Sequence, residues 1–524
     1  MERHRTALAI LGAALLLGFV WDATVRYIPW GVNVLVWVTA FLVAAFVVTP
    51  RERRAGMFFP AVCALIAACS LLWRDSPALA ALNVVTLLVM LPMLALGARG
   101  VRLADAGVAE IAVAHVVTGV QSVAGFPQLL LSDLSWSKVP SGGIRGAGVA
   151  VRGTIIALPA LVIFGSLLSA ADAGFAELLG NLFAFRVESV IEHLLVIGVV
   201  SAVCAGFFRS LALSGPMPRY RRPAVLGLPA AETNFALTLV NALFLLFVIM
   251  QLRYFFGAAP DALAQYARRG FFELVLVVAL VVPMLLVVEW LIDKENGVRL
   301  FRTLAIAQIA LVFVIAYSAY HRMRLYRDEF GLTVQRFFTT AFMIWVAVLL
   351  LWFVVTVLSG RRNRFAIGAL ATGVAAVVIL HAVNPDRRIV ETNLARAREG
   401  KRALDTRYIL GLSDDAAEPI LANKELFGQA LWSFTGQPRT IGWRTWNVSR
   451  ARAIALIEAS GVERDPAYRP PRRDPRRIDA RVEELPKVRH LQEQVPVTDT
   501  VDGNRQEQQR QHAEEDPRRG SGNR

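Results

Sequence analysis

Residues 272–292 read FELVLVVALVVPMLLVVEWLI, an almost unbroken apolar run with one carboxylate near each end. An α-helix of about 20 such residues crosses the roughly 30 Å hydrocarbon core of a bilayer. Because hydrocarbon offers no water to hydrogen-bond with a bare backbone, a helix is the form that such a run takes there. The sequence therefore predicts a transmembrane helix over Phe272–Ile292.

Similar runs flank this one on both sides, and together they predict an all-α, polytopic transmembrane helix bundle of about 11 spans. The composition agrees, since a chain that is 55% hydrophobic with a mean hydropathy of +0.49 is too apolar for a soluble protein of 524 residues. The other predicted spans are Ala7–Val20, Val32–Val48, Phe58–Trp73, Leu79–Leu96, Val149–Ala170, Leu194–Leu211, Phe235–Phe255, Leu304–Tyr320, Phe338–Leu358 and Phe365–Val383.

The basic loops predict how the bundle is oriented. The net charge of +15 would suggest nucleic acid in a soluble chain, but in a membrane protein basic loops set orientation and meet anionic lipid. With a cytoplasmic N-terminus, the inner loops hold roughly twice as many lysines and arginines as the outer loops. We therefore expect the lipid bilayer as the partner, no nucleic acid, and everything after Val383 on the extracytoplasmic side. This requires the semi-polar stretch Ala98–Gly148 to lie along the inner interface as amphipathic helices; one crossing there would invert every later loop.

The chain after the last span divides into two parts. Residues 384–461 predict a small helical extracytoplasmic lobe, because Asn384-Pro385 and Ser413-Asp414-Asp415 are helix-start signals. Fewer than about 80 residues bury little surface, so the lobe should dock on the bundle of residues 1–383. Its Trp432, Trp443 and Trp446 would form a small core or rest on the membrane surface. Residues 462–524 are rich in Arg, Pro, Glu and Gln and predict a disordered tail.

The usual signatures of metal and cofactor sites do not occur in the sequence. Cys63, Cys69 and Cys204 all lie in apolar spans and form no C-x-x-C pair, and there is no H-E-x-x-H. The glycines between Gly142 and Gly153 follow no strand and make no phosphate-binding loop. We expect no metal and no cofactor.

The predicted outer ends of spans seven to ten carry arginines and tyrosines side by side. A tight hairpin should bring Arg253 and Glu273 to a similar depth. Guanidinium forks suit a phosphate, and phenols anchor at the depth of lipid headgroups. The alternative to a binding site is that these arginines only extend their charged groups to the membrane surface and these tyrosines only anchor the helix ends there. The candidate ligand-binding residues, with Asp172 and Asp386 nearby, are Arg253, Tyr254, Tyr266, Arg268, Glu273, Arg324 and Tyr326.

Several of these stretches also carry a family resemblance. Residues 232–257, 266–273 and 324–333, Asn384-Pro-Asp386 with Asn393, and the 404–416 segment resemble bacterial multi-pass membrane proteins catalogued as domain of unknown function 4173, or its sister family 4153. The resemblance covers roughly residues 135–425. It implies an integral membrane protein of the bacterial cytoplasmic membrane with an extracytoplasmic end. It brings no activity, so no catalytic residue is assigned.

Three functions remain open at this point. The first is a non-enzymatic membrane protein that binds an anionic lipid, another envelope component or a protein partner of unknown identity at its outer face. The second is a transporter, which the interruptions of spans by Pro92, Pro159 and Pro283 favour. The third is a membrane glycosyltransferase with a lipid-linked donor, for which Trp21-Asp22 would supply the acidic residue of the first outer loop; a lone aspartate capping a span is the alternative.

Overall fold

The computed structural model describes residues 2–26, 29–134, 187–217, 228–256, 271–292, 298–400, 404–439 and 441–462, with a few positions between 153 and 175. Met1–Asp465 form one compact unit. The described part is helical, with one isolated bridge between Leu228 and Ile292. The second unit, Pro466–Arg524, lies outside the described residues, as does most of the predicted span Val149–Ala170.

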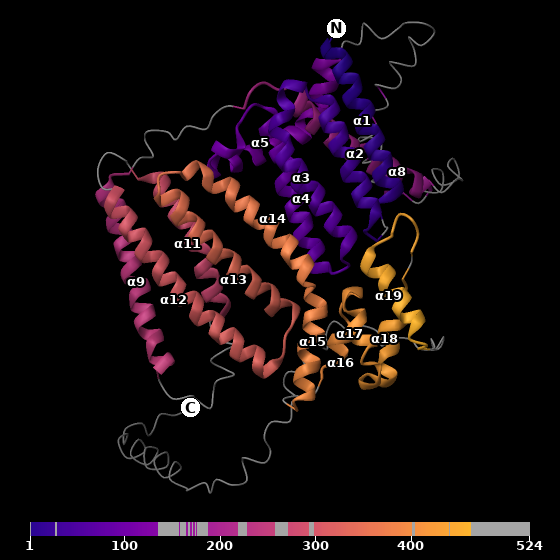
Figure 1. The fold of residues 1–524 in the computed structure, drawn as a ribbon. Coiled ribbons are helices and arrows are strands. Elements are labelled where there is room, and N and C mark those ends of the chain that lie inside the picture. Colours follow the sequence, from indigo (N-terminus) through magenta and orange to yellow (C-terminus); the bar gives the residue numbers. More distant parts are fainter. Residues whose placement is uncertain are drawn as a thin grey trace, which may run out of the picture. The chain divides into compact units, whose positions relative to one another are not determined.

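The membrane-type helices form two groups (Figure 1). The first group contains α1 (Glu2–Thr24), α2 (Val32–Val48), η1 (Arg51–Met57), α3 (Phe58–Trp73), α4 (Pro77–Ala98), η2 (Leu103–Asp105), α5 (Val108–Gln128), η3 (Leu129–Asp133) and α8 (Val187–Ala212). The second group contains α9 (Ala230–Phe256), α11 (Phe271–Leu291), α12 (Val298–Phe330), α13 (Val334–Phe353), η6 (Val354–Leu358), η7 (Arg362–Arg364) and α14 (Phe365–Val383).

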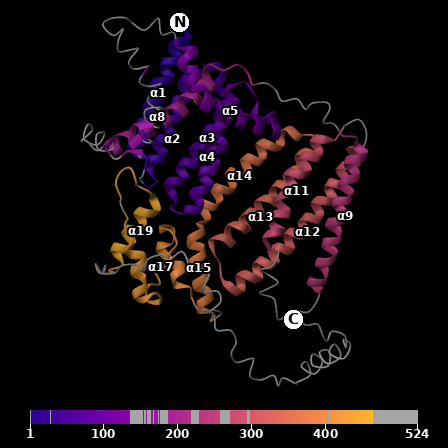
Figure 2. The same ribbon diagram turned by 180° about the vertical axis from the view of Figure 1, so that it is seen from behind.

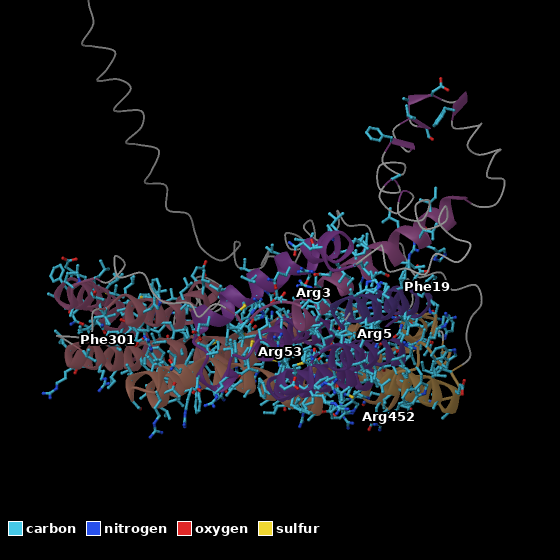
Figure 3. All side chains as sticks on the ribbon, turned by 90° about the horizontal axis from the view of Figure 1, so that it is seen from above. Arg3, Arg5, Phe19, Arg53, Phe301 and Arg452 are labelled. Carbon is cyan, nitrogen blue, oxygen red and sulfur yellow. The ribbon has the colours of Figure 1, made fainter. Side chains whose placement is uncertain are left out.

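Each group has its own apolar core. Phe208 and Leu94 are fully buried in the first core, and Phe353 and Leu285 in the second. Helix α14 joins the groups, since it contacts α3 and α4 on one side and α13 on the other. Viewed along the helices, Phe301 lies in the second group, and Arg3, Arg5 and Arg53 lie in the first (Figure 3).

Every predicted span that falls within the described residues is a helix. In that part of the chain, 10 helices are long and apolar enough to cross a membrane. Helix α2 is shorter, but its 17 residues still extend about 25 Å at 1.5 Å per residue. The prediction of an all-α polytopic bundle is therefore confirmed, and the protein is an integral, multi-pass membrane protein.

Ion pairs define the two ends of the first group. At one end, Asp133 binds Arg3 at 2.7 Å and Arg209 at 2.6 Å, which brings the start of α1 next to the end of α8. At the other end, Asp22 near the end of α1 accepts a hydrogen bond of 2.6 Å from His193 near the start of α8. Helices α1 and α8 are therefore antiparallel. We call these the N-terminal end and the lobe end of the bundle.

Helix α5 lies across the N-terminal end instead of crossing the bundle. Asp105, just before α5, lines a cavity with Arg362, and Asp133, just after it, binds Arg3. In between, Arg99 at the end of α4 donates a 3.1 Å hydrogen bond to Gln121. Its length and composition alone would allow a crossing. The contacts instead agree with the predicted interfacial position for the described part of this stretch, residues 98–134.

The lobe begins directly after α14. It contains α15 (Pro385–Arg398), α16 (Thr406–Leu410), η8 (Asp414–Ala416), α17 (Ala417–Leu421), η9 (Lys424–Leu426), η10 (Gly428–Leu431), α18 (Trp432–Thr435) and α19 (Val448–Ala459), which lie together beyond the end of α14 in Figure 2. Its core holds Ile389, Ile420 and Phe434.

A single residue turns the chain from α14 into the lobe. Asn384 adopts a left-handed backbone (φ 55°), which asparagine tolerates better than most side chains. Its side chain accepts a hydrogen bond of 3.1 Å from the Arg387 amide, and Pro385 occupies the first helical turn. The predicted helix start at Asn384-Pro385 is thus confirmed, and so is the one at Ser413, which caps η8.

The tryptophans of the lobe do not make its core. Trp443 is 68% exposed and Trp446 is 40% exposed. Their loop pairs with the bundle, because the amides of Val32 and Asn33 donate to the carbonyls of Trp446 and Arg444 at 3.0 Å. Trp443 and Trp446 therefore lie beside the ends of α1 and α2, where exposed indoles are typical of a membrane–water interface.

Candidate functional site

The structure describes three of the predicted site residues with their side chains. Arg324 is exposed and Tyr326 is half-buried, both in the last turns of α12. Glu273 is exposed in the first turn of α11. The predicted Arg253–Glu273 pair stays a prediction, because the side chains or whole positions of the other residues lie outside the described part: Arg253, Tyr254, Tyr266 and Arg268. Asp172 is exposed and accepts a hydrogen bond of 2.7 Å from the Phe175 amide.

The end of α9 lies beside the last turns of α12. The Gln251 side chain accepts hydrogen bonds from Ser318 at 3.2 Å and from Arg322 at 2.6 Å. Arg322 is only 6% exposed, so its charge is held inside the helix bundle. The structure thus brings the arginine-bearing end of α9 to the same end of the bundle as Arg324 and Tyr326.

A cavity of about 410 Å³ lies next to Tyr326, where α12 turns into α13 and the lobe packs on that turn. The turn needs Gly331, whose φ of +81° disfavours any other residue. Asn393 of α15 clamps the turn, donating to the Leu332 carbonyl at 2.8 Å and accepting from the Leu332 amide at 2.9 Å. We call this cavity the Arg336 pocket; it is lined by Phe330, Gly331, Leu332, Thr333, Arg336, Asn393, Arg396, Leu404, Asp405, Tyr408 and Ile409.

Two guanidinium groups converge on this turn. Arg336 donates to the Gly331 carbonyl and lies over the Tyr326 ring, 4.2 Å from its centroid. Arg396 donates to the carbonyls of Arg327, at 2.6 Å, and Asp328. Among the described residues, no carboxylate lies within ion-pair distance of either arginine. Both charges are met by backbone carbonyls, and Arg336 also lies over the rings of Tyr326 and Phe330.

The remaining polar groups of the pocket do not neutralise this charge. Asp405 caps α16, accepting a hydrogen bond of 3.0 Å from the Tyr408 amide. The Tyr408 hydroxyl accepts a hydrogen bond of 2.8 Å from the Val334 amide. Burial raises the pKa of the Tyr408 phenol, so it stays neutral and its O–H can donate. The pocket therefore presents two cations, a neutral donor and one carboxylate, Asp405, which is engaged as a helix cap.

A second polar cluster, which we call the junction network, holds the lobe to the loop between α3 and α4. Asp415 is the acceptor at its centre. The amides of Asp75 and Ser76 both donate to its carboxylate at 2.9 Å, and the Ser449 hydroxyl donates to its other oxygen. The Arg74 guanidinium lies 3.5 Å away.

The other charges of the junction network are also paired. Arg450 binds Asp75, and Arg439 binds Asp414 at 2.7 Å. Burial raises the pKa of Asp75 to about 6 despite the nearby Arg450. Burial also raises the pKa of Asp414, and that of Asp386, which accepts the Ser413 hydroxyl. Because each of these arginines faces a carboxylate, the junction network acts as a structural clamp whose described arginines are all paired.

Asp22 is held by two side chains at the lobe end of the bundle. Its carboxylate accepts hydrogen bonds from Arg26 at 3.0 Å and from His193 at 2.6 Å. These contacts tie α1 to α8 and give Asp22 a structural role as an ion-pair partner within the last turn of α1. Among the described residues, no group of three or more histidines, cysteines or carboxylates could hold a metal ion.

The sequence did not single out Arg336, Arg396 and Tyr408 as site residues. Asn393 and Tyr408 were noted only for the family resemblance. The signal that could have found the site is the three-residue spacing of Asn393 and Arg396, which places both on one face of α15. Their partner turn lies more than 60 residues earlier.

The comparison with protein families places the chain. A family model described as Domain of unknown function (DUF4153) matches residues 61–423. The chain belongs to this family. It is the sister family named in the sequence resemblance. The DUF4153 segment contains the whole Arg336 pocket, whereas the junction network takes Arg439, Ser449 and Arg450 from beyond it. No curated protein and no solved structure matches the chain.

Proposed function

We propose that this multi-pass membrane protein binds an anionic, lipid-like envelope ligand in the Arg336 pocket, on the extracytoplasmic side of the bacterial cytoplasmic membrane. The observation that carries the proposal is the pair Arg336 and Arg396, which meet at one turn without a carboxylate partner among the described residues. Two neighbouring like charges destabilise each other unless an anion lies between or beside them. Guanidinium forks match the oxygens of a phosphate or carboxylate.

The position of the pocket supports a ligand that is anchored in the membrane. The pocket lies where α12 ends and α13 begins, and both helices are apolar enough to span. Tyr326 and Arg324 stand on the same end of α12. Tyrosine and arginine at this depth suit a headgroup, while the exposed apolar faces of the helices below suit acyl chains. The proposal keeps Arg324 and Tyr326 at the rim and adds Arg336, Arg396 and Tyr408.

The test is lipid retention by the full-length protein in nanodiscs of mixed neutral and anionic phospholipid. Arg336→Gln and Arg396→Gln should each lower the bound anionic lipid by about tenfold, because one hydrogen bond between charged groups is worth roughly 1.5–3 kcal/mol. Arg398→Gln is the matched control, since Arg398 is exposed on α15, the helix of Arg396, and donates a hydrogen bond to Asn423 instead. Equal retention by all three variants would refute the proposal.

Two further arms define the ligand and the extent of the site. Inorganic phosphate should compete for the pocket only if the headgroup alone is recognised, whereas vesicles of anionic lipid should compete in either case. Arg253→Ala and Glu273→Ala should reduce retention while insertion stays intact, as the predicted outer-face site requires. If both alanine variants retain lipid normally, the site is confined to the Arg336 pocket.

A transporter is the second candidate, and one observation favours it. Gln308, in the first half of α12, is completely buried, and its amide nitrogen and oxygen have no hydrogen-bond partner among the described residues. Buried polar groups inside spans are costly and often mark a translocation path. Proteoliposome flux of an anionic solute, with Gln308→Leu as the variant, distinguishes transport from binding. A Gln308→Leu protein that is more stable and shows unchanged flux would remove this candidate.

A further inference from the structure

A cavity at the other end of the bundle is not used by the proposed function. It has a volume of about 910 Å³ and lies between the start of α5 and the end of α11, that is, between the two helix groups. This volume is in the upper part of the range of ligand sites in proteins. Its apolar walls come from both helices: Val108, Ala112 and Val113 of α5, and Leu286 and Val287 of α11.

The apolar walls continue onto exposed surfaces of both helices. Along α5, Val113, Val116, Val120 and Val123 are between 37% and 71% exposed, and their spacing places them on one face of the helix. On α11, Val287 is 52% exposed in a span with no charge between its first and last turns. A hydrocarbon chain is the ligand that such a groove accepts from a membrane.

The polar rim of the groove has an acidic part and an adjacent basic part. Asp105, Glu110 and Glu289 line the 910 Å³ cavity. A neighbouring cavity of about 390 Å³ shares Asp105 and Glu289 and is lined by four arginines: Arg302, Arg361, Arg362 and Arg364. Arg362 lines both cavities and lies 3.5 Å from Glu289, so the acidic and basic parts adjoin.

We propose that this groove binds a zwitterionic aminophospholipid, with its phosphate on the arginines and its primary ammonium on the carboxylates. An acyl chain would lie between α5 and α11. Arg362 already pairs with Glu289, but a purely anionic lipid would place no positive charge opposite Asp105 and Glu110. A quaternary ammonium would lack the N–H donors that a carboxylate accepts from. The primary amine is the headgroup that satisfies both parts of the rim. The site is independent of the Arg336 pocket, which lies at the lobe end.

The test uses the full-length protein in nanodiscs with equal parts of ethanolamine, choline and glycerol phospholipids, with bound lipid identified by native mass spectrometry. The ethanolamine lipid should be enriched over the bulk mixture. Arg362→Gln should lower this enrichment by about tenfold, from the loss of a charged hydrogen bond. Asp105→Asn together with Glu110→Gln should shift the preference toward the anionic glycerol lipid.

Two variants separate binding from a folding defect. Val113→Trp should fill the apolar groove and expel the lipid without changing any charge. Arg51→Gln, exposed at the same end but outside the groove, should leave enrichment unchanged. Bound lipid with the composition of the bulk mixture, equal binding of the choline lipid, or a Val113→Trp protein that still enriches the ethanolamine lipid would each overturn the inference.

Discussion

Replacing Asp415 with alanine should undock the lobe from the bundle. Asp415 is 6% exposed and accepts hydrogen bonds from two backbone amides and the Ser449 hydroxyl, with Arg74 at 3.5 Å. The substitution leaves these donors buried without an acceptor. It also removes the carboxylate that faces a largely buried guanidinium.

The expected loss of stability is about 3–5 kcal/mol, the usual cost of removing one partner from a buried charged network. Asp415→Asn keeps one carbonyl oxygen as an acceptor and should cost only about 1–2 kcal/mol. In a protein of this size these values correspond to a fall in melting temperature of about 3–5 °C for alanine and about 1–2 °C for asparagine.

The assay is thermal unfolding of the purified protein in detergent, together with trypsin cleavage in the folded state. The alanine variant should release lobe fragments at a temperature where the wild type is intact. Asp328→Asn is the control, because the Asp328 carboxylate is 58% exposed, and it should change stability by less than about 0.5 kcal/mol. An Asp415→Ala protein that melts and resists trypsin like the wild type would falsify the role given to the junction network.

Two other predictions concern stability. The pKa of Asp75 is raised from 3.8 to about 6, so the folded state takes up a proton more readily than the unfolded state, and the free energy of unfolding should rise by about 1 kcal/mol as the pH falls from 7 to 5. Thermal melts at both pH values check this, and Asp75→Asn should reduce the gain. A stability that falls between pH 7 and pH 5 would contradict the assignment. Gly206→Val should lower the free energy of unfolding by about 1–3 kcal/mol or more, because a Cβ at this position of α8 would lie 2.1 Å from the Ser122 carbonyl oxygen of α5. Gly198→Val on α8 is the control, since a Cβ there meets nothing within 4 Å. Equal melting temperatures for the two variants would contradict the close packing of α5 and α8.

The bundle could be predicted from the sequence because the bilayer imposes a length and a composition on each span. Phe272–Ile292 is the clearest case, and α11 begins and ends within one residue of that range. The turn at Asn384 could also be predicted, since an asparagine before a proline carries its own backbone and capping preferences. Both features depend on residues that are close in sequence.

The site could be predicted only in part, because its contacts join distant segments. Tyr326 was chosen for its type and its place at a helix end, and it does lie against Arg336. No local pattern indicates that Arg396 meets the turn after α12, or that Asp415 binds the amide of Asp75, 340 residues earlier. The tryptophans of the lobe were equally ambiguous, because indoles suit both a small core and an interface.

Labelling of single cysteines with a membrane-impermeant reagent tests most directly whether the lobe, and with it the Arg336 pocket, faces away from the cytoplasm. The positions are Glu52→Cys at the N-terminal end and Gln429→Cys in the lobe, both exposed, in a chain whose native Cys63, Cys69 and Cys204 are replaced by alanine. In intact cells position 429 should react, and position 52 should react only after the membrane is opened. Labelling of position 52 but not 429 in intact cells would place the lobe in the cytoplasm and contradict the proposed outer-face site.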